Sequence, residues 1–159
     1  MRRVESTAWH CLFLMTLPSI AAMTLLPQER FPTLSGMLEG LRILVLEDEY
    51  LIAMDVEQLC RDHGAVDVTV ARCLEDIEDG LDFDAAIIDV LLGGVSTFGF
   101  AARLKDTGTP FVFASGYTDD AELAKRFPGV AMVGKPYSGK DLVEAVAAAC
   151  GRMLASGSA

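Results

Sequence analysis

Short apolar runs alternate with segments of helical periodicity along the chain after residue 40. The first run, residues 41–46, is almost continuously apolar, which is typical of a strand buried on both faces of a parallel sheet. It ends abruptly at the acidic residues Glu47, Asp48 and Glu49. Similar runs recur, and the predicted strands are residues 41–46, 66–70, 85–88, 111–114 and 130–133.

Between these runs, apolar residues repeat at intervals of three and four, which predicts amphipathic helices. Gly64 and Gly108 follow two of these segments at the place of a helix C-cap. Ser138 and Asp141 form a capping-box pattern before the last one. Residues 91–96 contain two glycines and are predicted to form a loop over a ligand. The predicted helices are residues 51–63, 74–80, 98–104, 119–126 and 138–153.

This alternation predicts an α/β domain with a doubly wound, five-stranded parallel sheet and helices on both faces. Parallel neighbours require crossover connections, and these are right-handed, so successive helices cover the sheet. Ligands of such sheets bind beyond the carboxyl ends of the strands. The informative residues are therefore those that directly follow the apolar runs: Glu47, Asp48, Asp89, Ser115 and Lys135.

These residues favour phosphoryl transfer to a carboxylate. Acidic side chains at one sheet edge repel one another unless one is protonated or a cation lies between them. Asp48 and Asp89 offer oxygen ligands without a nearby cysteine or histidine, which favours Mg²⁺, and Glu47 is predicted to act through water. Lys135 adds a positive charge and Ser115 a hydroxyl donor, which could neutralise charge on phosphoryl oxygens.

In this order and at these strand ends, the residues resemble the receiver domain of two-component response regulators. The resemblance covers residues 41–153. It implies a CheY-like, flavodoxin-like sheet with strand order 2-1-3-4-5. The residues that carry it are the acidic pair Glu47 and Asp48, the isolated Asp89, the hydroxyl residue Ser115 and the dipeptide Lys135-Pro136.

The resemblance also implies a role for each of these positions. Asp89 is the expected phosphoacceptor, and Asp48, Asp89 and the backbone carbonyl of Leu91 are the expected Mg²⁺ ligands. Ser115 is the expected switch hydroxyl, and Lys135 is expected to contact the phosphoryl group. The peptide bond between Lys135 and Pro136 is expected to be cis, a conformation found in only about 5–6% of X-Pro bonds.

The chain departs from the common family pattern at the switch. Met132 stands where the family usually has a tyrosine or phenylalanine. Residues 113–117, Phe-Ala-Ser-Gly-Tyr, resemble the signature of the branch called FAT GUY response regulators, which lacks that aromatic residue. The predicted switch residues are therefore Ser115, Met132 and Tyr117.

The first forty residues allow several interpretations. Residues 6–28 carry no formal charge and follow Arg2 and Arg3, as in a signal or anchor, but Pro18 interrupts the run and leaves it short of the roughly 20 residues of a membrane helix. Translation from Met37 is one alternative, and a poorly ordered or partner-packing segment is another. The predicted organisation is an extension over residues 1–39, a receiver domain over 40–154 and a tail over 155–159.

The net charge and the cysteine content limit which binding partners and which cellular compartment are expected. The chain has 13 Lys and Arg against 23 Asp and Glu, a net charge of −10 that disfavours nucleic acid binding. The four cysteines lack the spacing of a zinc site or a disulfide framework. A reducing compartment fits this cysteine usage, so a cytoplasmic location without membrane association is expected.

The resulting prediction is a single-domain response regulator, monomeric or weakly dimeric, that is not an enzyme beyond its own phosphorylation and autodephosphorylation. A histidine kinase or phosphotransfer protein is the expected phosphodonor. Output is expected through a downstream protein or onward phosphotransfer, because residues 136–159 suffice only for a helix and a tail. One alternative is a receiver-like scaffold that docks a kinase or regulator without phosphorylation. A flavodoxin-like FMN site is disfavoured, because acidic residues 47–49 occupy the place of its phosphate loop.

Overall fold

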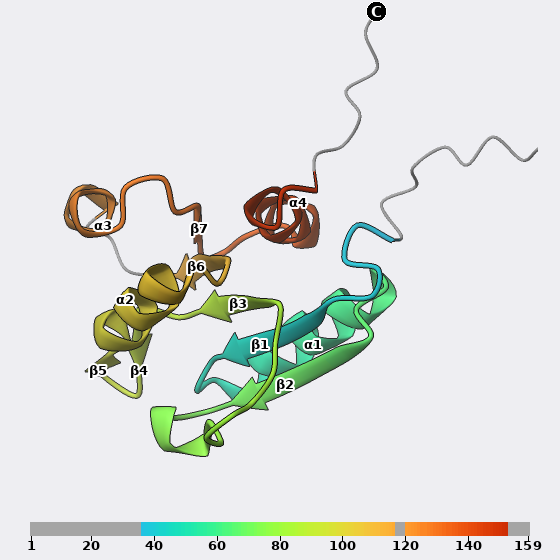
Figure 1. Cartoon of the computed structure of the whole chain (residues 1–159), viewed down its shortest axis with the longest axis horizontal. Coiled ribbons are helices and arrows are strands. Elements are labelled where there is room, and N and C mark those ends of the chain that lie inside the picture. The colour runs from blue at the N-terminus through green and yellow to red at the C-terminus, as the bar shows by residue number, and fades with distance from the viewer. Residues whose placement is uncertain (1–35, 117–119, 153–159) are drawn as a thin grey trace, which may run out of the picture. The chain divides into compact units, whose positions relative to one another are not determined.

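The computed structural model describes residues 36–116 and 120–152, and in them it confirms the predicted α/β class. Five parallel strands pair in the order β2-β1-β3-β6-β7, so the order along the sheet is 2-1-3-4-5 when only its own strands are counted (Figure 1). The strands are β1 (Arg42–Leu46), β2 (Asp67–Ala71), β3 (Ala85–Ile88), β6 (Phe111–Ser115) and β7 (Met132–Gly134).

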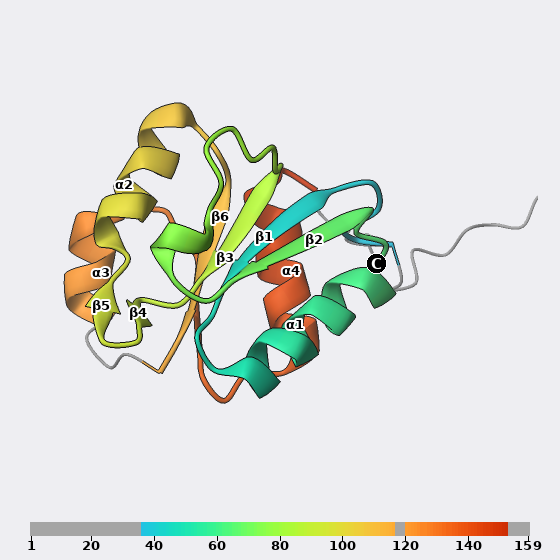
Figure 2. The same ribbon diagram turned by 90° about the horizontal axis from the view of Figure 1, so that it is seen from below.

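Helices cover both faces of this sheet. Figure 2 shows α1 (Tyr50–Asp62) and α4 (Gly139–Ala149) on one side, and α2 (Phe98–Thr107) and α3 (Asp120–Arg126) on the other. Each face has its own apolar core, because strands buried on both sides alternate their side chains between the two layers. The Ser138 hydroxyl accepts a hydrogen bond from the Asp141 amide and caps α4, as the sequence pattern predicted.

The predicted helix at residues 74–80 is wrong. Only a 3₁₀ turn, Leu74–Asp76, forms there. The Asp76 carboxylate accepts hydrogen bonds from the amides of Arg72 and Cys73 and forms a capping box with Cys73, but the turn ends at Ile77, whose backbone is extended. Apolar side chains of this crossover pack on the sheet in place of a helix: Leu74, Ile77, Leu81 and Phe83.

The loop predicted at residues 91–96 is a β-hairpin instead. Strands β4 (Leu91–Leu92) and β5 (Val95–Ser96) pair in an antiparallel manner. The two residues between them, Gly93 and Gly94, have φ angles of 58° and 85°. A two-residue hairpin of this type requires positive φ at both central positions, which glycine adopts without strain.

Leu38, which lies two residues before the predicted start of the domain at Gly40, packs into the core. Leu38 is fully buried in the core beneath α1 and α4, and its amide donates a hydrogen bond to the His63 carbonyl. Gly64 has a φ of 92°, and a Cβ there would lie 3.1 Å from the Glu39 Cα, so this contact depends on glycine. Residues 1–35 and the predicted tail, 155–159, lie outside the described residues.

Arg42 ties the start of β1 to the segment that leads into β3. Its backbone amide, Nε and Nη2 all donate to the Asp84 carboxylate, at 2.9, 3.1 and 2.9 Å. Hydrogen bonds from the Arg42 side chain, and then from its backbone amide, lower the pKa of Asp84 to about 2. The Asp84 carboxylate therefore stabilises the fold in its ionised form.

We expect Asp84→Asn to lower stability at pH 6 and to lower it much less near pH 2. A carboxyl group whose pKa is lower in the folded chain stabilises it above the unfolded pKa, about 3.9, and the contribution is lost as pH falls through the folded value. Urea unfolding of both proteins at several pH values measures the difference. The exposed Asp106→Asn is the control, and a deficit that did not shrink toward pH 2 would contradict the expectation.

Within residues 36–116 and 120–152, no helix has the length and apolar character needed to cross a membrane.

Candidate functional site

Strand register brings the predicted site residues to one edge of the sheet. Leu46 pairs with Ile88, so the chain leaves β1 and β3 side by side, at Glu47 and Asp89. Ser115 pairs with Gly134 at the ends of β6 and β7, which places Lys135 next to that strand end. Parallel strands end at the same edge, and this geometry gathers residues that are up to 88 positions apart in the chain.

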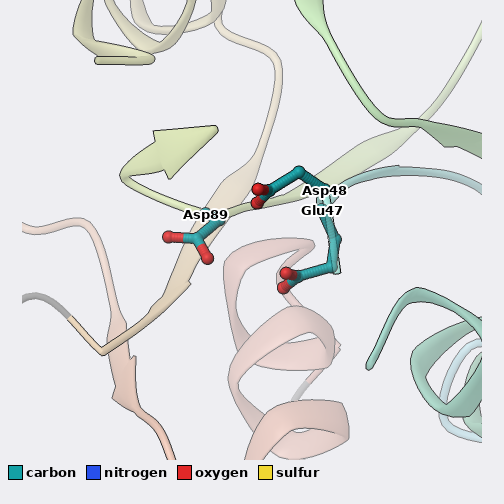
Figure 3. Close-up of side chains that lie close together, drawn as sticks. All are labelled: Glu47, Asp48 and Asp89. Atoms are coloured by element: carbon teal, nitrogen blue, oxygen red, sulfur yellow. The ribbon is translucent and has the colours of Figure 1, made fainter. Parts of the chain in front are cut away.

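Three carboxylates lie together at this edge. Glu47, Asp48 and Asp89 each offer an oxygen atom within 4.8 Å of the others. Figure 3 shows the carboxylates of Glu47 and Asp48 both on the side that faces Asp89, one above the other in this view. Glu47 and Asp89 are buried, with 3% and 8% of their surface exposed, whereas Asp48 is half-buried.

Lys135 is the cation that pairs with the two buried carboxylates. Its Nζ donates to Glu47 Oε2 at 2.5 Å and to Asp89 Oδ2 at 2.7 Å. Burial by itself lowers the pKa of Lys135, but the hydrogen bonds to Asp89 and Glu47 outweigh it and raise the pKa above the ordinary value. Burial also raises the pKa of Glu47, and the bond to Lys135 opposes this in part. A protonated lysine therefore pairs with two of the three carboxyl groups at this edge.

The Asp89 carboxylate is held at both of its oxygens. Oδ1 accepts a hydrogen bond from the Ser115 hydroxyl at 2.7 Å and one from the Leu91 amide at 3.2 Å, while Oδ2 accepts from Lys135. Ser115 thus already bonds to Asp89 in this structure. If a group were added to Asp89, the Ser115 hydroxyl would give up its hydrogen bond to Asp89 Oδ1 and donate to the new group instead. The hydroxyl already lies at the site and would not have to move there from a distant position.

Two residues at the site were missed in the sequence. Thr97 is fully buried, and its hydroxyl donates to the carbonyls of Asp89 and Val90, at 2.7 and 3.2 Å. These bonds anchor the backbone that carries Asp89. Arg72 follows β2, and its guanidinium donates to the Asp48 carbonyl. Examination of the two residues after the predicted second strand, 66–70, would have found Arg72.

Of the remaining predicted site residues, all but Tyr117 lie within the described part of the structure. Met132 pairs with Phe113 across β6 and β7 and packs against the core beneath α2 and α3. The Lys135–Pro136 peptide bond is cis, the conformation that the resemblance implies. Tyr117 lies outside the described residues. The Leu91 carbonyl remains a predicted ligand, because the contact seen at this residue is made by its amide.

The donor set fits a hard divalent cation. It consists of carboxylate oxygens, with no sulfur or imidazole ligand among the residues that form the cluster. Oxygen-only sets with two or more carboxylates are typical of Mg²⁺, which keeps several waters and shares its shell with phosphates. Asp48, which is half-buried, offers the carboxylate most open to such an ion.

The sheet order and the acidic edge, with its buried aspartate, lysine and hydroxyl, match the fold of CheY-like receiver domains. Solved structures that are similar to this chain include response regulator receiver domains. A response regulator receiver protein from Sinorhizobium medicae is 26% identical, with a TM-score of 0.62 over 72% of this chain and 97% of that chain. A CheY-like receiver domain protein from Methanospirillum hungatei is 21% identical, with a TM-score of 0.61 over 71% and 95% of the two chains.

A curated protein is similar over a shorter range. The transcriptional regulatory protein TcrA of Mycobacterium tuberculosis is 38% identical over 72 residues, which are 44% of this chain and 28% of that protein. The chain thus spans less than a third of the length of this relative. No family model matches the chain. The resemblance to response regulator receiver domains, and with it the connection to two-component signalling, is confirmed, whereas the FAT GUY branch remains a prediction.

Proposed function

We propose that the protein is a response regulator that accepts a phosphoryl group on Asp89. The observation that carries this proposal is the position of the Asp89 carboxylate, which is bonded to Lys135 and Ser115 and lies beside two further carboxylates. An amine, a hydroxyl and a cation-binding acid cluster are the groups that phosphoryl transfer requires, since its catalysis consists of positioning and charge stabilisation.

The proposed reaction takes the phosphoryl group from a phosphohistidine. An Asp89 oxygen forms the new bond to phosphorus, and the phosphorus–nitrogen bond breaks with its electron pair left on the imidazole. Lys135 and Ser115, which now bind the two Asp89 oxygens, would then bind the phosphoryl oxygens. Glu47, Asp48 and Asp89, with the Leu91 carbonyl, would hold Mg²⁺, which neutralises phosphoryl charge when bound.

The phosphodonor would be a histidine kinase or a phosphotransfer protein. A groove of about 880 Å³ lies between α1 and the turn from β7 to α4. Its lining includes Ile52, Val56 and Leu59 as well as Lys135, so a protein seated on α1 would be next to the Asp89 site. The acidic groove side chains Glu49, Asp55 and Asp62 favour a partner with basic groups.

The output would be a change in surface contacts. Transfer of the Ser115 hydroxyl from Asp89 to a phosphoryl oxygen supplies the differential contact that a two-state change requires. Met132 and Tyr117 are the proposed switch residues alongside Ser115. The chain would act in the cytoplasm as a monomer or weak dimer, with a downstream protein as its target and no catalysis beyond its own phosphorylation and autodephosphorylation.

The test is the intact mass of the full chain after incubation with acetyl phosphate, with and without Mg²⁺. We expect the gain of one phosphoryl group that requires Mg²⁺ and is removed by hydroxylamine, as for an acyl phosphate. Asp89→Asn should abolish the gain, whereas Asp82→Asn, an exposed aspartate that pairs with Arg42, should keep it. A gain that persisted in Asp89→Asn would contradict the proposal.

One observation favours a second candidate, a receiver-like scaffold that docks a kinase or regulator without phosphorylation. Met132 replaces the aromatic residue that the family couples to the switch hydroxyl. A chain that gained no phosphoryl group from either acetyl phosphate or a phosphorylated kinase, yet bound that kinase, would support the scaffold.

A further inference from the structure

We propose that Arg72 is a positioning residue for the metal-binding carboxylate of Asp48. The Arg72 Nη2 and Nε donate to the Asp48 carbonyl at 3.0 and 3.3 Å. A guanidinium presents its donors in a rigid fork, so two such bonds to one oxygen restrict the orientation of the peptide that follows Asp48. The proposal rests on the proposed function, because it assigns Asp48 to a cation.

The orientation of the Asp48 carboxylate is not fixed by contacts of the side chain itself. Within the described residues, the Asp48 side chain itself makes no hydrogen bond or ion pair, since Arg72 binds the Asp48 backbone carbonyl. Asp89 and Glu47, by contrast, are each fixed by Lys135. The direction of the Asp48 carboxylate therefore depends on its backbone, and Arg72 is the side chain that binds that backbone.

The crossover between β2 and β3 holds Arg72 in place. The Glu47 amide donates to the Ala71 carbonyl at 3.1 Å, so β1 and β2 stay paired up to the residue before Arg72. The Asp76 carboxylate then accepts from the Arg72 amide at 2.9 Å. The 3₁₀ turn Leu74–Asp76, which forms where a helix was expected, thereby fixes the backbone from which the Arg72 side chain reaches Asp48.

A positioning role and a purely electrostatic role of Arg72 predict opposite changes in Mg²⁺ affinity when Arg72 is replaced. Arg72 is a positive charge near a cation site, so if charge were its only effect, its removal would strengthen Mg²⁺ binding. If Arg72 positions Asp48, its removal weakens Mg²⁺ binding. Arg72→Lys separates the two effects, because lysine keeps the charge and loses the planar fork.

The experiment is a Mg²⁺ titration of the full chain, followed by the amide NMR shifts of residues 47–49 and 89–91. We expect Arg72→Lys to bind Mg²⁺ about fivefold more weakly than the wild type. Loss of a residue that supports a metal ligand typically lowers metal affinity about 10- to 100-fold, and we expect a smaller loss here because Arg72 is exposed. Arg103→Lys on α2, whose guanidinium lies over the Phe100 ring, is the matched control and should bind as the wild type does.

Two further variants keep the inference open to refutation. Asp76→Asn leaves the Arg72 side chain intact and weakens the turn that holds it, so it should lower Mg²⁺ affinity about twofold, a fraction of an outer-shell effect. Arg72→Met should also bind more weakly than the wild type. Wild-type or tighter binding by Arg72→Lys, or tighter binding by Arg72→Met, would overturn the inference.

The phosphorylation assay on the same samples separates this inference from the proposed function. A wild type that is phosphorylated at Asp89, together with Arg72 variants of unchanged Mg²⁺ affinity, overturns the role of Arg72 alone. A wild type that neither binds Mg²⁺ nor gains a phosphoryl group overturns both.

Discussion

Replacement of Lys135 with Met is expected to lower the free energy of unfolding by about 3 kcal/mol at pH 7, the lower end of the cost of removing one partner from a buried ion pair. The lysine side chain is 15% exposed, and those of Glu47 and Asp89 are 4% and 10% exposed, so water replaces the lost cation poorly. Phosphorylation by acetyl phosphate should fall at the same time by about a hundredfold, the typical loss when one charge-stabilising donor is removed.

The pH dependence of this deficit identifies its cause. Burial raises the pKa of Glu47, and Lys135 opposes that rise, so Lys135→Met raises the pKa further. A group whose pKa is higher in the folded chain stabilises it below the unfolded pKa, about 4.3, and this contribution is lost as pH rises through the folded value. The deficit should therefore be small near pH 4 and grow toward pH 7.

Urea unfolding from pH 4 to pH 8 measures this effect. Lys140→Met is the matched control, because Lys140 is exposed on α4 and its pair with Glu144 spans 3.7 Å, so the change should be near zero. A deficit of equal size at pH 4 and pH 7 would show that Lys135 acts through packing rather than through the buried carboxylates.

Phe113→Ala is expected to cost about 4 kcal/mol, as is typical of a fully buried phenylalanine. The Phe113 ring meets Phe111 and Phe127 edge-on, with centroids 5.4 and 5.2 Å away, so the truncation removes aromatic contacts and leaves a cavity. Because Phe113 pairs with Met132 and lies two residues before Ser115, the variant should also weaken the end of β6 that carries the hydroxyl.

Chemical unfolding followed by circular dichroism gives the stability of this variant. Phe98→Ala is the matched control, since Phe98 is only partly buried and contacts the same cluster through Phe127 at 5.8 Å. It should cost less than half as much. Equal costs for the two variants would contradict the central position of Phe113 in this core.

The hydrophobic pattern correctly predicted those strands and helices that bury their side chains at regular intervals. The apolar run at 41–46 became β1 because a central parallel strand is buried on both faces, and the pattern of the last helix matched α4 with its Ser138 cap. The prediction of a helix at 74–80 was wrong, because the apolar residues of this segment pack on the sheet from an irregular crossover. The glycine pair at 93–94 was interpreted as a loop although it is the turn of a hairpin.

The sequence by itself determined the five strands of the main sheet and the residues that lie at its carboxyl edge, because hydrophobic periodicity and parallel topology are readable from the chain alone. Only the tertiary structure decided how these residues meet: that Lys135 bridges Glu47 and Asp89, that Ser115 already bonds to Asp89, and that Thr97 and Arg72 hold backbone carbonyls. Every residue offers the same carbonyl oxygen, so contacts to the backbone leave no pattern in the sequence and arise only when the strands are packed side by side.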